Sequence, residues 1–198
     1  MPAARRNEFH IPHFRASEEP VPANTATPAA DGHRYATILA DPPWDTLQKG
    51  ARGAIRHYPV MALDAIKTLP VGRLAQDRAH CWLWVTNATV HVGQDVLTAW
   101  GFTYRSILTW IKPRFGLGIY LRNQTEHLLL GTRGSAPIRF RGQGSWFYAP
   151  LQEHSHKPEE QFAIIERCSP GPYLELFARR RRPGWHVWGN EVDSDVAL

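Results

Sequence analysis

Short apolar runs alternate with amphipathic segments between residues 35 and 188, and this alternation restricts the fold more than any other feature of the sequence. The apolar runs predict strands over 35–40, 81–85, 103–111, 127–130, 173–177 and 186–188. The amphipathic segments predict helices over 63–69, 90–100 and 158–167. Residues 112–125 suit a long surface loop, and residues 142–149 suit a hairpin-like piece. We therefore expect an α/β fold with a mainly parallel sheet and helices on both faces, with ligand sites beyond the carboxyl ends of the strands.

The chain has 198 residues, enough for one good-sized core, and residues 34–198 are expected to form a single domain. Residues 1–33 are rich in Pro and Ala and lack sustained apolar periodicity, so their burial would not offset the entropy of ordering them. We expect this segment to be a disordered tail.

The formal net charge of +5 favours a polyanionic partner without identifying one. The two cysteines, Cys81 and Cys168, lie in apolar stretches without paired spacing, so neither a disulfide framework nor a metal site is expected. The sequence contains no apolar run long enough to cross a bilayer and no secretory signal. We expect an intracellular, cytoplasmic protein that does not bind membranes.

The tetrapeptide Asp41-Pro42-Pro43-Trp44 ends the first predicted strand, at the place where an α/β fold positions its chemistry. An exocyclic adenine amine is a poor nucleophile, and the Asp41 carboxylate and the Pro42 carbonyl would accept its two protons. The prolines fix φ and remove N–H donors, and Trp44 would stack on an extruded base. The alternative is a rigid turn without catalytic function.

The motifs around this tetrapeptide follow a fixed order along the chain. They are 40–44 (ADPPW), 58–61 (YPVM), 82–86 (WLWVT), 110–112 (WIK), 126–127 (EH), 155–159 (SHKPE), 165–167 (IER), 169–171 (SPG), 175–179 (ELFAR) and the stretch from Trp185 to Asn190. In this order the chain resembles the adenine-N6 methyltransferases typified by the catalytic subunit of the eukaryotic messenger-RNA methyladenosine writer. Within that family it resembles most the standalone bacterial and phage DNA-modifying members.

The resemblance implies a Rossmann-like, S-adenosylmethionine-dependent methyltransferase fold over 34–198, circularly permuted so that the catalytic motif precedes the cofactor motif. It implies catalysis by the four residues 41–44. Lys157 would pair with the cofactor carboxylate and Glu175 would accept from its ribose hydroxyls. The other cofactor-binding residues would be Asp41, Leu176, Phe177, Arg179, Asn190 and Glu191. The run Arg179 to Arg182 stands where the RNA writer has a His-Asn pair, and it would face cofactor or phosphate, or form a solvated loop.

Basic side chains with interleaved aromatic rings are expected around the active face, as a nucleic-acid groove requires. The predicted nucleic-acid-binding residues are Tyr58, Lys112, Arg114, Arg122, Asn123, Arg139, Arg141 and His156. Their aromatic neighbours are Phe115, Tyr120, Phe140 and Trp146.

The favoured function is methylation of the N6 amine of adenine in DNA, because the compact Arg-rich domain lacks RNA-reading modules such as zinc fingers. An RNA adenosine methyltransferase with the same chemistry is the first alternative. A catalytically inactive subunit of a methyltransferase complex is the second, and the presence of Asp41 argues against it. A small DNA-binding regulator would need a helix-turn-helix or an arm, and the sequence offers neither. A homodimer and a partner subunit both remain open.

Overall fold

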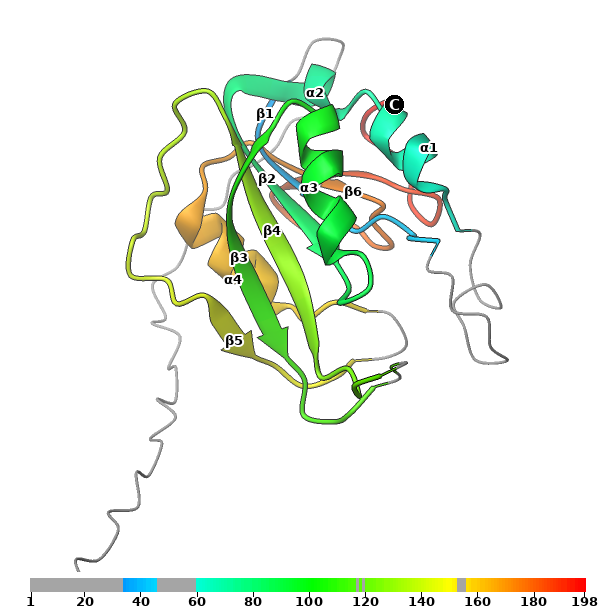
Figure 1. Cartoon of the computed structure of the whole chain (residues 1–198). Helices are drawn as coiled ribbons and strands as arrows, with labels where there is room; N and C mark the ends of the chain where they lie inside the picture. The colour runs from blue at the N-terminus through cyan, green and yellow to red at the C-terminus, as the bar shows by residue number, and fades with distance from the viewer. Residues whose placement is uncertain (1–33, 46–59, 117, 119, 153–155) are drawn as a thin grey trace, which may run out of the picture.

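The computed structural model describes residues 34–45, 60–116, 118, 120–152 and 156–198, and the expected tail over 1–33 lies outside them. Within these residues seven strands form one sheet in the order β5-β3-β4-β2-β1-β6-β7 (Figure 1). The strands are β1 (Tyr35–Ala40), β2 (Ala75–Val85), β3 (Thr103–Ile111), β4 (Thr125–Arg133), β5 (Trp146–Tyr148), β6 (Tyr173–Leu176) and β7 (Trp185–Trp188). The helices are α1 (Leu63–Thr68), α2 (Val71–Leu74), α3 (Val90–Ala99) and α4 (Glu160–Cys168).

Four of the six neighbouring strand pairs are parallel, which confirms the expected mainly parallel sheet. The exception is β4, which runs antiparallel to both β2 and β3. We call the edge where β1, β2, β3 and β6 end the carboxyl edge, and the opposite one the amino edge. Because β4 is reversed, it begins at the carboxyl edge and its last residue lies at the amino edge.

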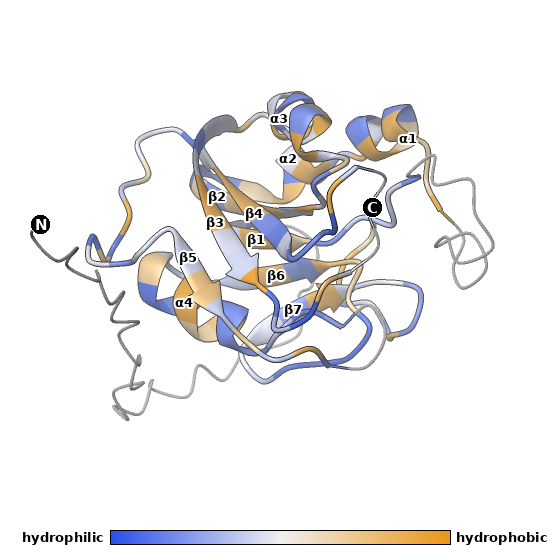
Figure 2. Cartoon of the chain, turned by 60° about the horizontal axis from the view of Figure 1, so that its bottom comes forward, coloured by the Kyte–Doolittle hydropathy of each residue, from blue (hydrophilic) through white to orange (hydrophobic). Residues whose placement is uncertain are grey.

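Two apolar layers cover the sheet, because successive residues of a strand point to opposite faces. On β1, Ile38 packs in the cluster that includes Ile66 of α1 and Leu97 of α3. Leu39 packs instead in the cluster that includes Ile165 of α4. Figure 2 shows α1, α2 and α3 on one side of the sheet and α4 on the other, as a Rossmann-like α/β fold requires. No helix in the described part of the chain has the length and apolarity needed to cross a bilayer.

Four elements, β2, α2, β4 and β5, differ clearly from the prediction. Strand β2 begins at Ala75 rather than at Cys81, because its early residues Asp77 and Arg78 are exposed and hide the apolar signal of a strand. The helix α2 was not predicted, since four residues are too few to show the apolar periodicity of a helix. Strand β4 covers 125–133 rather than 127–130, and within the predicted hairpin-like piece only 146–148 form a strand.

The C-terminal segment folds back along β7 and satisfies the outer side of that strand. The amide of Asp195 donates to the Val187 carbonyl across 2.8 Å. The amide of Val187 in turn donates to Oδ2 of Asp195 across 2.9 Å. Beyond it, Val196 and Leu198 pack against the core cluster on the α3 face. This edge of the sheet is therefore closed by a segment of the chain itself.

Candidate active site

Asp41 immediately follows β1 at the carboxyl edge. The last residue of β1, Ala40, is flanked by Leu83 of β2 on one side and by Leu176 of β6 on the other. The Asp41 amide donates to the Leu176 carbonyl across 3.4 Å. The carboxylate is thus presented from a central parallel strand, the position at which α/β sheets bind ligands.

The proline pair after Asp41 is held by backbone hydrogen bonds. The Pro43 carbonyl accepts from the Met61 amide across 2.8 Å, and Trp44 forms an isolated parallel bridge with Met61. The Pro42 carbonyl accepts from the Trp44 amide across 2.9 Å. A carbonyl oxygen has two lone pairs, so the Pro42 oxygen keeps one for a further donor.

Trp44 lies in the core rather than on the surface of the site. Its side chain is only 8% exposed, and its indole N–H donates to the Trp84 carbonyl across 2.9 Å. The expected stacking of Trp44 on a base does not fit this placement, because neighbouring core side chains cover the ring. The residue instead anchors the loop that follows β1 to β2.

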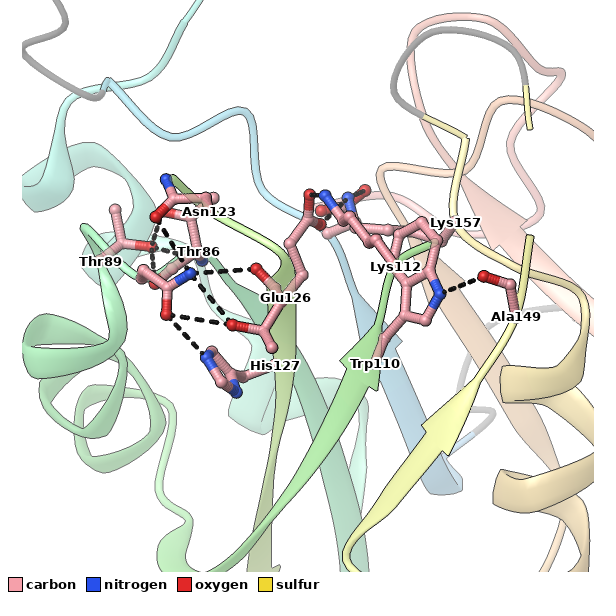
Figure 3. A network of polar contacts seen from close by, with 12 residues as sticks. Thr86, Thr89, Trp110, Lys112, Asn123, Glu126, His127, Ala149 and Lys157 are labelled. Atoms are coloured by element: carbon pink, nitrogen blue, oxygen red, sulfur yellow. Dashed lines mark hydrogen bonds and ion pairs between the residues drawn. The ribbon is translucent and has the colours of Figure 1, made fainter. Parts of the chain in front are cut away.

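Four side chains of alternating charge, Asp41, Lys157, Glu126 and Lys112, lie in a row at the carboxyl edge. Figure 3 shows Glu126 with Lys112 and Lys157 beside it. Nζ of Lys157 donates to Oδ2 of Asp41 across 2.7 Å and lies 3.4 Å from Oε2 of Glu126. Nζ of Lys112 donates to Oε1 of Glu126. The reversal of β4 makes this row: it places Glu126, near the start of β4, between Lys112 after β3 and Lys157 before α4.

Each of the charged groups Glu126 and Lys157 is stabilised in its charged form by neighbours of opposite charge. Burial acts to raise the pKa of Glu126, but Lys157 and Lys112 outweigh it and hold that pKa below its usual range. Burial acts to lower the pKa of Lys157, but Asp41 and Glu126 outweigh it and raise that pKa. Glu126 and Lys157 are therefore both charged at neutral pH.

Two tryptophans form a rigid wall beside this row. Nζ of Lys157 lies 5.2 Å from the ring centroid of Trp84, and Nζ of Lys112 lies 4.8 Å from that of Trp110. The two rings meet edge to face with centroids 6.2 Å apart. The indole of Trp84 donates to Oε1 of Gln161 across 2.7 Å, and that of Trp110 donates to the Ala149 carbonyl across 2.9 Å. Cation–π contacts and these hydrogen bonds fix both lysines and both rings.

A cleft opens at the carboxyl edge and gathers most of the predicted cofactor residues. Its lining includes Asp41, Lys157, Glu175, Phe177, Arg179 and Glu191, together with His156. Burial, with a further contribution from Asp41, raises the pKa of Glu175 to about 7, and Arg182 partly opposes this shift. Nε of Arg179 lies 3.7 Å from Oε1 of Glu191. The cleft therefore combines carboxylates with guanidinium and ammonium groups.

The segment after β6 turns sharply at Phe177, whose φ of 63° lies in the left-handed region that non-glycine residues seldom adopt. Such backbone conformations often occur at ligand sites, where the surrounding structure stabilises them. Two predicted cofactor residues do not line the cleft. The Leu176 side chain is fully buried in the core, and Asn190 is exposed beside Glu191.

The arginine run after β6 divides between the cleft and its surroundings. Arg179 and Arg180 line the cleft. Arg181 points to the C-terminal segment, where it lies 2.7 Å from Oδ1 of Asp195. The guanidinium of Arg182 lies 3.9 Å from the ring centroid of Phe162 and pairs with Glu159. The arginine run was expected either to face cofactor or phosphate, or to form a solvated loop. The structure instead places two of its arginines in the cleft lining and pairs the other two with acidic side chains.

The predicted nucleic-acid residues do not form one groove. Arg114 and Arg122 are exposed in the loop after β3, at the carboxyl edge. In the same region Lys112 is committed to Glu126, and Asn123 accepts from Asn87 across 3.4 Å. Tyr58 lies outside the described residues.

Arg139 and Arg141 were expected at the active face, and this expectation is wrong. They follow the reversed strand β4, so their loop leaves the sheet at the amino edge (Figure 1). There the Arg139 amide donates to the Cys168 carbonyl at the end of α4 across 2.8 Å. The length of β4, nine residues, separates this loop from the cleft.

Glu126 is a site residue that the sequence did not identify, although the dipeptide Glu126-His127 is one of the family motifs. A polar network behind it ties three strand ends together (Figure 3). Nε2 of His127 lies 3.0 Å from Oδ1 of Asn87, and Nδ1 of His127 lies 3.0 Å from Oγ1 of Thr109. A carboxylate at the start of an otherwise apolar strand was the signal available in the sequence.

No group of three or more His, Cys, Asp or Glu side chains with metal-binding geometry is found among the described residues. In the cleft the charged groups are instead paired with one another through Asp41, Lys157 and Glu126.

Comparison with known proteins gives one family and relatives of two kinds. The family model described as MT-A70 matches residues 35–191. The chain is 35% identical over 173 residues to the N(6)-adenosine-methyltransferase MT-A70-like protein of Drosophila melanogaster, covering 81% of this chain and 27% of that protein. It is 33% identical over 175 residues to the N(6)-adenosine-methyltransferase catalytic subunit METTL3 of Homo sapiens, covering 81% of this chain and 29% of that protein.

The second kind of relative is comparable in length to this chain. The chain is 27% identical over 197 residues to the type II methyltransferase M.MunI of Mycoplasma sp, covering 88% of this chain and 84% of that protein. The first relatives, in contrast, are matched over less than a third of their own length.

Proposed function

This chain belongs to the MT-A70 family of N6-adenosine methyltransferases, and from that membership we propose that it methylates the N6 amine of adenine in DNA with S-adenosylmethionine as methyl donor. We propose residues 34–198 as the catalytic domain. The observation that carries the proposal is the placement of Asp41 at the mouth of a charged cleft, 2.7 Å from Lys157. A carboxylate held at this position by a buried lysine is suited to receive an amine proton.

The groups in the cleft suit the chemistry of S-adenosylmethionine. An ammonium group, that of Lys157, suits the carboxylate of the cofactor's methionine part. The Glu175 carboxylate suits vicinal ribose hydroxyls, and the Phe177 ring offers an apolar surface for the adenine. We propose Arg179 and Glu191, which also line the cleft, as further contacts. When bound, the cofactor supplies an electrophilic methyl group on a positively charged sulfur.

Asp41 and Pro42 orient the acceptor amine in this proposal. The carboxylate of Asp41 and the remaining lone pair of the Pro42 carbonyl accept the two N–H protons, which keeps the nitrogen lone pair aimed at the methyl carbon. The amine would lose one proton when it accepts the methyl group, and the Asp41 carboxylate would receive that proton. Lys157 holds that carboxylate in place through the 2.7 Å contact between its Nζ and Oδ2 of Asp41.

The choice of DNA rests on the relative of comparable length. M.MunI is a type II methyltransferase, and the match extends over 84% of it. The competing candidate is an RNA adenosine methyltransferase, which is favoured by the higher identity to proteins named N(6)-adenosine-methyltransferases.

Mass spectrometry of nucleosides tests the proposal. DNA and RNA are isolated from a host that expresses the wild type or Asp41→Ala, and each is digested to nucleosides. We expect N6-methyladenine to increase in DNA with the wild type alone. An increase confined to RNA would establish the competing candidate, and no increase in either nucleic acid would reject the activity.

A further inference from the structure

The amino edge of the sheet carries a concentration of exposed arginines, far from the cleft. Six of them come from the starts of β1, β2 and β3 and from the loop after β4. They are Arg34, Arg73, Arg78, Arg105, Arg139 and Arg141, and we call this surface the basic end.

Hydrogen bonds join these segments into one surface. Nε of Arg78 donates to the Ser135 carbonyl across 2.5 Å, which ties the start of β2 to the loop after β4. Nη1 of Arg133 donates to the Gly72 carbonyl across 2.5 Å, which ties the end of β4 to α2. Nε of Arg105 donates to Oγ1 of Thr132 across 2.8 Å. The arginines are therefore held side by side on a folded framework.

Few acidic groups balance this surface. In the segments 34, 72–79, 103–106, 133–144 and 166–173, the acidic residues are Asp77 and Glu166. Asp77 lies 3.4 Å from Arg34, and Glu166 accepts from the Trp185 indole across 2.8 Å. Apart from Arg34, the arginine contacts of this surface are to neutral oxygens, such as those of Arg78 and Arg105, and they leave the positive charge uncompensated. A guanidinium also has five N–H donors, so such a contact leaves donors for another ligand.

The basic end is too far from the cleft to contact the nucleotides around the target base. Arg34 lies seven residues before Asp41, and Arg78 lies seven residues before Val85 at the end of β2, which corresponds to about 23 Å at roughly 3.3 Å per residue. A straight duplex rises about 3.4 Å per base pair, so about seven base pairs separate these arginines from the cleft along its axis.

We propose that the basic end binds the phosphate backbone of the substrate nucleic acid at a position remote from the target adenine. The inference rests on the proposed function for the identity of the substrate, and it adds a second contact site to it. Exposed guanidinium groups bind phosphate through charge-assisted, often bidentate hydrogen bonds. Contacts of this kind carry no sequence information but retain the enzyme on a long substrate.

Methyl-transfer kinetics on duplexes of two lengths test the inference. The duplexes share one adenine-containing centre and have about 10 and about 40 base pairs, so that only the longer one reaches the basic end. We expect R139Q/R141Q to raise KM for the long duplex about tenfold or more at low salt, since each lost phosphate contact changes the salt slope by about 0.9. KM for the short duplex and kcat for both should stay at wild-type values.

The matched control is R114Q/R122Q, which removes the same charge at the carboxyl edge and should raise KM for both lengths. Circular dichroism verifies that both variants are folded. An unchanged KM of R139Q/R141Q on the long duplex, or an equal rise on both lengths, overturns the inference.

A binding measurement decides the same question if the wild type methylates no DNA and the proposed function fails. We expect the wild type to bind two labelled 10-base-pair duplexes per chain and R139Q/R141Q to bind one. A single site in both proteins overturns the inference.

Discussion

Nζ of Lys157 lies 2.7 Å from Oδ2 of Asp41, a contact that joins residues 116 positions apart in the chain. The contact places the lysine before α4 directly against the acid that follows β1. It links the 41–44 motif to the segment that leads into the charged cleft, and through Glu126 to the loop after β3. The expected effects of substitutions in the site follow from this connection.

Asp41→Asn removes the proton acceptor but keeps the size of the side chain. We expect the methyl-transfer rate to fall by roughly 10²- to 10⁴-fold, the range typical of a lost general base. Cofactor affinity should change by no more than a few-fold, because Lys157 keeps Glu126 as its counter-ion. Transfer of a labelled methyl group and calorimetric titration of the cofactor measure the two effects. Asp45→Asn, at an exposed position of the same loop, is the control, and undiminished turnover in Asp41→Asn would exclude the assigned role.

Glu126→Ala leaves the partly buried Lys112 and Lys157 without the carboxylate between them. Removing one partner of a fully buried ion pair costs about 3–5 kcal/mol, and because these side chains keep some contact with solvent we expect the free energy of unfolding to fall by about 2–3 kcal/mol. Urea denaturation monitored by tryptophan fluorescence measures it. The control is Glu160→Ala on the exposed first turn of α4, which should change stability by less than about 0.5 kcal/mol. Equal stabilities of the two variants would contradict a structural role for the charged row.

The raised pKa of Glu175, about 7 because of burial and then of Asp41, predicts a pH-dependent cofactor affinity. The ionised carboxylate accepts two ribose hydrogen bonds more readily than the protonated one, so affinity should increase as the pH rises through about 7. Glu175→Gln should abolish this dependence. Calorimetric titrations between about pH 6 and pH 8 compare the two proteins, and a parallel pH dependence in both would assign the effect to another group.

The raised pKa of Glu175 also determines how its contribution to the free energy of unfolding changes with pH. The pKa in the folded protein exceeds the ordinary value of 4.5, so between these values the folded state binds more protons than the unfolded state. The contribution of Glu175 to the free energy of unfolding is therefore fully present below about pH 4.5 and is lost as the pH rises through about 7. Relative to Glu175→Gln, the wild type should lose stability over that window.

Lys112 and Arg122 should differ in their effect on nucleic-acid binding, although both were expected to contact phosphate. Arg122 is exposed, so Arg122→Ala should flatten the slope of log affinity against log salt by about one unit. Lys112→Ala should leave the slope unchanged and lower stability, because its ammonium group is bound to Glu126. Fluorescence titrations of a short duplex at several salt concentrations measure the slopes. Equal slopes for the two variants would show that Lys112 contacts phosphate as Arg122 does.

The sequence predicted β1 and β3 with their observed bounds, and the place of Asp41 at the end of β1. It did not reveal the direction of β4, because an apolar run reads the same in a parallel and an antiparallel strand. That one direction explains two results: it brings Glu126 into the site, and it carries Arg139 and Arg141 to the amino edge.

Trp44 shows a second reason why motif reasoning fell short. A tryptophan next to a catalytic acid is equally compatible with a stacking surface and with an anchor. The choice depends on tertiary packing, here on the Trp84 carbonyl that receives the indole N–H. Local sequence carries no record of such a partner.

The pairing of Asp195 with Val187 also matters for handling the purified protein. An uncovered strand edge is a template for association between chains, and the C-terminal segment removes that template from β7. A purification tag fused directly after Leu198 would pull on the residues that cover the strand, whereas a flexible spacer would leave them in place. Trimming the chain before Asp195 to aid crystallisation would remove the residues that cover β7. The exposed strand edge would then promote precipitation when the protein is concentrated.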